Sequence, residues 1–110
     1  MSVAKKNDKK DNKPDLSLLP KVFKAQVAYP MMVGITKYGR YNYTQGHNIC
    51  QLISAAERHL DEIKDGVDYD PECSESAGVK VHHAGCVAAN MLMLLHQLEL
   101  GTLIDDRYKK

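Results

Sequence analysis

The sequence predicts an all-α fold, and three observations support this class. Apolar residues recur every three or four positions in two long segments, 48–64 and 79–100. Gly66 and Gly101 follow these segments, at the position where glycine commonly ends a helix. A third periodic segment begins near Pro20 and contains Pro30. We therefore expect a kinked first helix and two long antiparallel helices, completed as a helical bundle by oligomerisation.

Length and charge limit what such a fold can do. The chain has 110 residues, 15 Lys and Arg against 14 Asp and Glu, and a formal net charge of +1. This balance argues against stable nucleic-acid binding through charge alone. We expect a disordered basic and polar tail over residues 1–15 and a single all-α domain over residues 16–110. A homo-oligomer would add the burial that so short a chain lacks.

The cysteines and apolar runs predict where the protein is found. Cys50, Cys73 and Cys86 are the three cysteines, and no apolar run follows Met1 as a signal peptide requires. The longest apolar run, 91–95, is far shorter than the roughly 20 residues that span a bilayer. We expect a cytoplasmic protein with no membrane partner.

The first helix is expected to start near Pro20 and to kink or break at Pro30, because an internal proline costs about 3 kcal/mol. Its last part should run from Met31 to Lys37, with Gly39 as the cap. The loop at 37–43 then combines Lys37 and Arg40 with three tyrosines. Such a loop suits phosphates and a stacked base. Its tyrosines equally suit simple packing over the helices.

The second helix should be capped by Asn48 and end at Gly66, with Ile49, Leu52, Ile53, Ala56, Leu60 and Ile63 on its apolar face. Glu57 and Asp61 are four residues apart, so their side chains lie about 40° from each other around the helix. Two carboxylates so placed suit a shared Mg²⁺ or Mn²⁺ ion. Carboxylates at this spacing are also common on solvated helix surfaces, and His59 beside them also suits packing.

We expect residues 65–78 to form an acidic loop. Asp68, Asp70 and Glu72 alternate in it, as oxygen ligands of a hard cation do, although the loop lacks the central glycine and final glutamate of an EF-hand. A solvated acidic turn is the alternative.

The last helix is expected over residues 79–100, with a buried stripe of Val87, Met91, Leu94, Leu95 and Leu98. His83, Cys86 and Asn90 share another face with small residues, which suggests a close helix pair with a recess. Apolar residues on more than one face of this helix, Met91, Met93 and Leu95, favour an oligomer.

Several short motifs together resemble one family. They are Leu18-Leu19-Pro20, Lys37-Tyr38-Gly39 with Asn42, Arg58-His59-Leu60, Gly66 followed by Asp70-Pro71-Glu72, and His83 with Asn90. In this order they are similar to the phage and bacterial dATP/dGTP diphosphohydrolase N-terminal domain family, which itself resembles the MazG-like all-α nucleotide pyrophosphohydrolases.

The resemblance implies metal-dependent hydrolysis of a (deoxy)nucleoside triphosphate, dATP or dGTP, to monophosphate and pyrophosphate with Mg²⁺ or Mn²⁺ as cofactor, in a bacterial or phage-infected cell. From this resemblance and from the spacings described above, the residues expected to act fall into three groups. The catalytic group is Glu57, His59 and His83; the substrate-binding group is Lys37, Tyr38, Arg40, Asn42, Arg58 and Asn90; the metal ligands are Glu57, Asp61, Asp68, Asp70 and Glu72.

Departures from the pattern leave other interpretations open. Cys86 stands where relatives often have a second histidine, and the EExxE and ExxD carboxylate signature of MazG-like enzymes is absent. These departures favour a non-catalytic nucleotide-binding or assembly protein with the same fold. A zinc site from Cys73, His83 and Cys86 is conceivable, although no CxxC pair accompanies it. An HD-type phosphohydrolase would need an adjacent His-Asp doublet, which does not occur.

Overall fold

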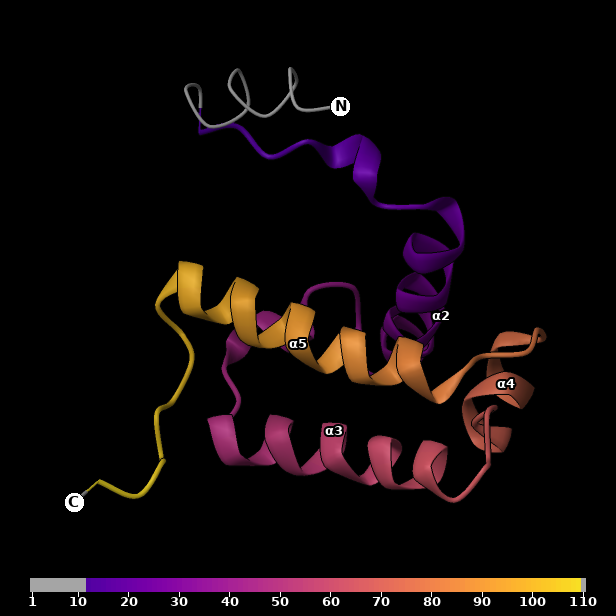
Figure 1. Ribbon diagram of the computed structural model, residues 1–110. Coiled ribbons are helices and arrows are strands. Elements are labelled where there is room, and N and C mark those ends of the chain that lie inside the picture. Colours follow the sequence, from indigo (N-terminus) through magenta and orange to yellow (C-terminus); the bar gives the residue numbers. More distant parts are fainter. Residues whose placement is uncertain (1–11, 110) are drawn as a thin grey trace.

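The regular structure is helical throughout residues 12–109, the part of the chain that the computed structural model describes (Figure 1). The elements are η1 (Leu16–Leu18), α2 (Lys21–Tyr38), η2 (Asn42–Gln45), α3 (Ile49–Lys64), α4 (Pro71–Ala77) and α5 (His83–Leu100). Within this part, β pairing is limited to two isolated bridges. The all-α prediction is confirmed. The expected tail lies, up to Asp11, outside the described residues.

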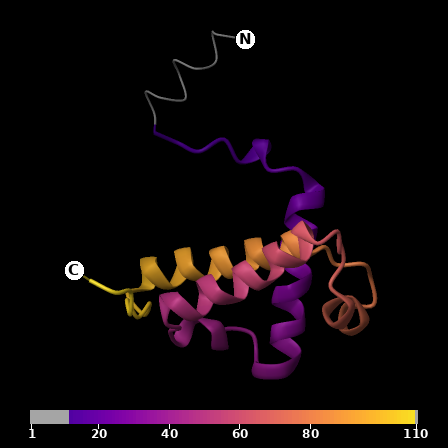
Figure 2. The ribbon, with the colours of Figure 1, turned by 60° about the horizontal axis from the view of Figure 1, so that its bottom comes forward.

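Helices α3 and α5 lie side by side and run in opposite directions, as expected (Figures 1 and 2). Helix α2 crosses the first half of α5, and the short α4 packs against α2. The buried residues of α3 are Ile49, Leu52 and Ala56. None of the helices within residues 12–109 has the length and apolar character needed to cross a membrane.

Helix α2 continues through Pro30 as one helix, so the break expected as one outcome there does not occur. Pro30 has no N–H to donate to the Gln26 carbonyl four residues earlier. That carbonyl oxygen lies against Gly85 of α5, where a Cβ would collide with it. A close backbone approach, which glycine permits, therefore coincides with the carbonyl that Pro30 leaves free.

Residues 65–78 are not a continuous loop, because residues 71–77 form α4. Asp70 caps this helix by accepting a hydrogen bond from Cys73 N–H, Pro71 occupies its first turn, and Gly78 ends it with φ 76°. These residues are typical of helix ends, but the acidic composition of the segment led to the prediction of a loop.

Helix α5 starts at His83, four residues later than predicted. Its expected buried stripe is wrong at Leu95 and Leu98, which are 64% and 63% exposed. The small and polar side is buried instead, including Gly85, Cys86 and Ala89. Small residues let α2 and α3 approach closely, so the helix turns this side inward and leaves the larger side chains outside.

Buried polar groups hold the loop between α2 and α3 on α5. Gln97 is fully buried; its Nε2 donates to Tyr43 O, and its Oε1 accepts from His47 N–H at 2.7 Å. The Tyr43 hydroxyl also pairs with His96 Nδ1 at 2.7 Å. Tyr43 therefore has a structural role in the loop, whereas Tyr38 and Tyr41 are 68% and 64% exposed.

Candidate functional site

Two histidines meet where α3 and α5 pass each other. His59 lies on the inner side of α3, and His83 is the first residue of α5. Their Nδ1 atoms are 2.8 Å apart, and their ring centroids are 5.1 Å apart. Because the helices are antiparallel, the late part of α3 faces the start of α5, which brings these residues together across 24 positions of sequence.

Asp70 joins this pair from the start of α4. Its Oδ1 accepts the Cys73 N–H at 3.0 Å, while its Oδ2 lies 3.7 Å from His59 Nδ1 and 4.0 Å from His83 Nδ1. Cys86 Sγ, one turn into α5, is 4.0 Å from the same oxygen. One carboxylate oxygen is therefore surrounded by two imidazoles and a thiol.

Backbone pairing fixes the position of Asp70. Its N–H donates to Val81 O at 2.9 Å, and His83 N–H donates to Asp68 O at 2.8 Å. The Val81 N–H is bound by Ser74 Oγ at 2.8 Å. These bonds hold the turn before α4 against the extended residues before α5.

Gln26 anchors the start of α5 from the other side. Its Oε1 accepts from His82 N–H at 2.7 Å, and its Nε2 donates to Lys80 O at 3.0 Å. His82 in turn caps α5 by accepting the Ala84 N–H at 2.9 Å. Gln26 was not among the predicted site residues.

Burial controls the protonation of the cluster. It lowers the pKa of His59, and the close His83 adds to this effect, while the Asp70 carboxylate opposes it. Burial also raises the pKa of Cys86 to about 12, with Cys73 and Asp70 adding to it. The pKa of Cys73 is raised for the same main reason. Without a bound cation, both thiols are protonated and His59 is neutral at pH 7.

The cluster forms one wall of a cavity of about 530 Å³ between the second half of α2, the following loop, α4 and α5. This volume falls within the range of small-molecule sites, about 300–1,000 Å³. The predicted site residues that line it are Lys37, Tyr38, Arg40, Asn42, His59, Asp70, Glu72 and Asn90. They come from segments far apart in the sequence.

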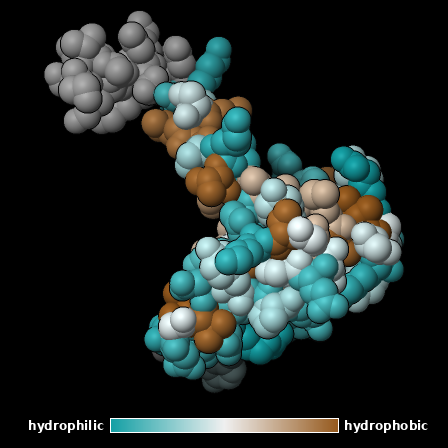
Figure 3. Space-filling model, turned by 90° about the vertical axis from the view of Figure 1, so that its right-hand side faces the viewer, coloured by the Kyte–Doolittle hydropathy of each residue, from teal (hydrophilic) through white to brown (hydrophobic). Residues whose placement is uncertain are grey.

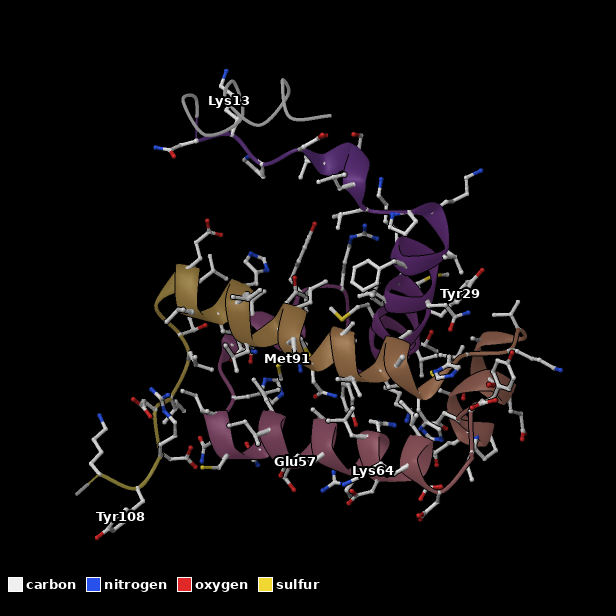
Figure 4. The ribbon with its side chains drawn as sticks, in the orientation of Figure 1. Lys13, Tyr29, Glu57, Lys64, Met91 and Tyr108 are labelled. Carbon is white, nitrogen blue, oxygen red and sulfur yellow. The ribbon has the colours of Figure 1, made fainter. Side chains whose placement is uncertain are left out.

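The other predicted site residues lie elsewhere. Glu57, Arg58, Asp61 and Asp68 are exposed and do not line the cavity, and Figure 4 shows Glu57 on the side of α3 away from α5. Arg58 donates to Ser54 Oγ at 3.0 Å, and Asp61 pairs with Lys64 at 3.5 Å. Buried His83 stands behind His59, outside the cavity wall.

The expected hard-cation site does not fit this arrangement. Of the five carboxylates predicted to bind Mg²⁺ or Mn²⁺, the cavity is lined by Asp70 and Glu72 alone. The donors that converge in the described residues are an imidazole, a thiol and the Asp70 carboxylate, whereas Mg²⁺ prefers oxygen ligands.

Cys73 and the apolar residues Met31 and Ile35 also line the cavity and were not among the predicted site residues. The sequence had indicated Cys73 only as a ligand of the conceivable zinc site. No pattern marked Met31 or Ile35, because apolar residues at helical spacing look the same whether they line a cavity or fill a core.

An all-α domain with a cavity between its helices, lined by both polar and apolar side chains, is the class of protein that this fold and site define. The chain matches the family described as dATP/dGTP diphosphohydrolase, N-terminal, over residues 3–107, and it belongs to that family. The dATP/dGTP diphosphohydrolase of Salmonella phage PMBT28 is 34% identical over 95 residues, which are 86% of this chain and 30% of that protein. This chain therefore spans less than a third of the length of that relative. No solved structure matches the chain significantly.

Proposed function

We propose that the cavity binds a purine deoxynucleoside triphosphate and that the protein hydrolyses it to the monophosphate and pyrophosphate. The observation that carries this proposal is the convergence of Lys37, Arg40, Tyr38 and Asn90 on one cavity. The name of the phage relative supports the nucleotide class.

The cations of the cavity are available to a phosphate chain. Lys37 and Arg40 flank the Gly39 cap of α2, and neither forms an ion pair within residues 12–109. Arg40 instead lies over the Tyr41 ring at 5.8 Å. A triphosphate requires such donors, because charge-assisted hydrogen bonds supply most of its recognition. We assign Lys37 and Arg40 to the phosphates.

Other residues that line the cavity suit a base. Tyr38 offers an exposed aromatic ring, and Met31 and Ile35 give an apolar wall. Asn90 Nδ2 donates to Cys86 O at 2.9 Å, which orients the amide with its oxygen as the acceptor for a ligand. Purine amino groups are donors that such an oxygen can bind.

In the metal-free protein, His59 is the base that the cavity offers for activating water. It is neutral at pH 7 because burial lowers its pKa, so it is able to accept a proton. Glu57, the other base expected from the sequence, is exposed outside the cavity. We therefore expect Glu57→Gln protein to release pyrophosphate at the normal rate.

A second function, nucleotide binding without hydrolysis, is favoured by two observations. The carboxylates expected to hold catalytic metal do not converge in the described residues, and the chain spans 30% of the phage relative. In that case the cavity of this chain would bind the nucleotide. Hydrolysis by the longer phage relative would then depend on its residues outside the matched segment.

The two functions are separated by measuring hydrolysis and binding in parallel. The purified chain is incubated with dATP, dGTP, dCTP or dTTP and with Mg²⁺, Mn²⁺ or Zn²⁺, and pyrophosphate and monophosphate are quantified. Binding is measured with a dATP analogue that has a non-hydrolysable α,β linkage. Pyrophosphate release from purine nucleotides supports the enzyme. Analogue binding without pyrophosphate supports the binding module, and absence of both overturns the proposal.

A further inference from the structure

We infer that His59, Asp70 and Cys86 form a site for a divalent transition-metal ion of the zinc class, with one coordination position open to the cavity. Each residue offers one donor atom, and the three atoms lie within 4.8 Å of one another. Ligands of one zinc ion, at about 2.0–2.3 Å from the metal, lie roughly 3–4 Å apart. Side-chain movements of about 1 Å would therefore complete the coordination.

The donor types decide the class of metal. Imidazole and thiolate are ligands of Zn²⁺ and related ions, and a single carboxylate completes such sets in known proteins. Mg²⁺ and Ca²⁺ need several oxygen ligands, whereas Asp70 is the one carboxylate in this set. The cluster thus differs in chemistry from the site that the helix carboxylates predicted.

The donors are held before any metal arrives. Asp70 is fixed by its cap to α4 and by its N–H bond to Val81, which directs Oδ2 toward the cluster. Cys86 projects from the buried side of α5. Ligands fixed by backbone bonds lose little freedom on binding, so such a site binds tightly.

The polar arrangement without a cation is unfavourable. The Nδ1 atoms of His59 and His83 are 2.8 Å apart, so one proton at most lies between them. His83 is 4% exposed, and its Nε2 has no hydrogen-bond partner. The partly buried Asp70 carboxylate faces imidazoles and a protonated thiol, with no cationic side chain paired to it in residues 12–109 other than a protonated histidine. A divalent cation would neutralise this carboxylate and occupy the lone pair of His59.

The position of the cluster indicates what the ion would do. His59, Asp70 and Cys86 all line the cavity, whereas His83 does not. Three protein ligands and a fourth position left for water or substrate are typical of catalytic zinc sites. The binding of metal stands on this geometry alone, and its use in hydrolysis rests on the proposed function.

Metal binding is tested on the metal-free full chain without nucleotide. Calorimetry should detect one Zn²⁺ per chain and much weaker binding of Mg²⁺. Co²⁺ should produce a thiolate-to-cobalt charge-transfer band, which Cys86→Ser abolishes and the matched control Cys50→Ser retains, because Cys50 is exposed at the start of α3. His59→Ala and Asp70→Asn should weaken Zn²⁺ binding at least about 10-fold.

A charge-transfer band that persists in Cys86→Ser, or Zn²⁺ binding no tighter than Mg²⁺ binding, overturns the site. Circular dichroism verifies that each variant is folded. If Cys86→Ser is not folded, the charge-transfer band of the wild-type Co²⁺ spectrum decides the question, and absence of that band overturns the site. Zinc binding without pyrophosphate release would leave this site standing and reject hydrolysis. Pyrophosphate release with Mg²⁺ and no zinc binding would support hydrolysis and reject this site.

Discussion

The backbone of Gly85 in α5 packs against the carbonyl oxygen of Gln26 in α2, so that even a methyl group at Gly85 would collide with it. Pro30 leaves this carbonyl without its helical donor. The same Gln26 holds residues 80 and 82 through its side chain. The crossing of α2 over α5 therefore sets where α5 starts, and with it the position of His83 and Cys86.

Gly85→Ala should destabilise the protein by about 1–3 kcal/mol, because the added methyl forces the two backbones apart. The measurement is urea unfolding followed by circular dichroism. Gly34→Ala is the matched control, since it lies inside α2 with no atom within 4 Å of an added Cβ. That change should be neutral or stabilising by about 0.5–1 kcal/mol. Equal effects of the two substitutions would refute the close approach.

Gln97→Leu should cost about 1–3 kcal/mol of unfolding free energy, although it preserves side-chain volume. It leaves the partly buried Tyr43 carbonyl and His47 N–H without their partner. Exchange of the amide hydrogens in residues 43–47 should accelerate as well. The control is Gln45→Leu, at an exposed position, which should stay within about 0.5 kcal/mol. Unchanged stability of Gln97→Leu would contradict the assigned anchoring role.

Lys37→Met should weaken binding of the non-hydrolysable dATP analogue on the order of tenfold, because a charge-assisted hydrogen bond contributes about 1.5–3 kcal/mol. Calorimetry measures the change. Lys64→Met is the control, because Lys64 lies outside the cavity and pairs with exposed Asp61. A loss of affinity of the same size in both variants would indicate general charge attraction and remove Lys37 from the phosphate site.

The metal-free protein should lose stability as the pH falls below about 6.5, the ordinary value for histidine. The folded pKa of His59 is lowered, mainly by burial, so the unfolded chain binds a proton that the folded chain does not. The stabilisation is fully present above the unfolded pKa and disappears toward the lower folded pKa. Melting temperatures between pH 8 and pH 5, with a chelator present, measure it. His59→Gln should flatten this dependence; an identical slope in the variant would contradict it.

The exposed apolar residues should bring chains together, as expected from the sequence. Leu16, Leu18, Leu19 and Val22 are exposed where the chain approaches the body of the protein, and Figure 3 shows hydrophobic residues gathered there. Leu95 lines an apolar groove between α2 and α5. Light scattering should find a dimer or larger assembly. Leu95→Lys should dissociate it, and Val67→Lys, exposed beyond α3, should not. A wild-type monomer would reject this prediction.

Local sequence patterns predicted the helices whose apolar residues recur at helical spacing and whose ends carry capping residues. Asn48, Gly66 and Gly101 marked helix ends correctly within a residue or two, because capping depends on neighbouring residues alone. The same logic was available for α4 in Asp70-Pro71-Glu72 and was missed. The buried side of α5 was not predictable in this way, because apolar side chains cover more than one side of that helix and its partners decide which faces inward.

The sequence by itself determined the helical class, the two long helices and eight of the residues that line the cavity, since periodicity, caps and motifs are local properties. Only the tertiary structure decided which polar residues meet. Glu57 and His59 are two residues apart on one helix, yet His59 faces the cavity and Glu57 faces solvent. His59, Asp70 and Cys86 converge because the antiparallel packing of α3 and α5, anchored through Gln26 and Gly85, brings distant positions together, and no local pattern encodes that distance.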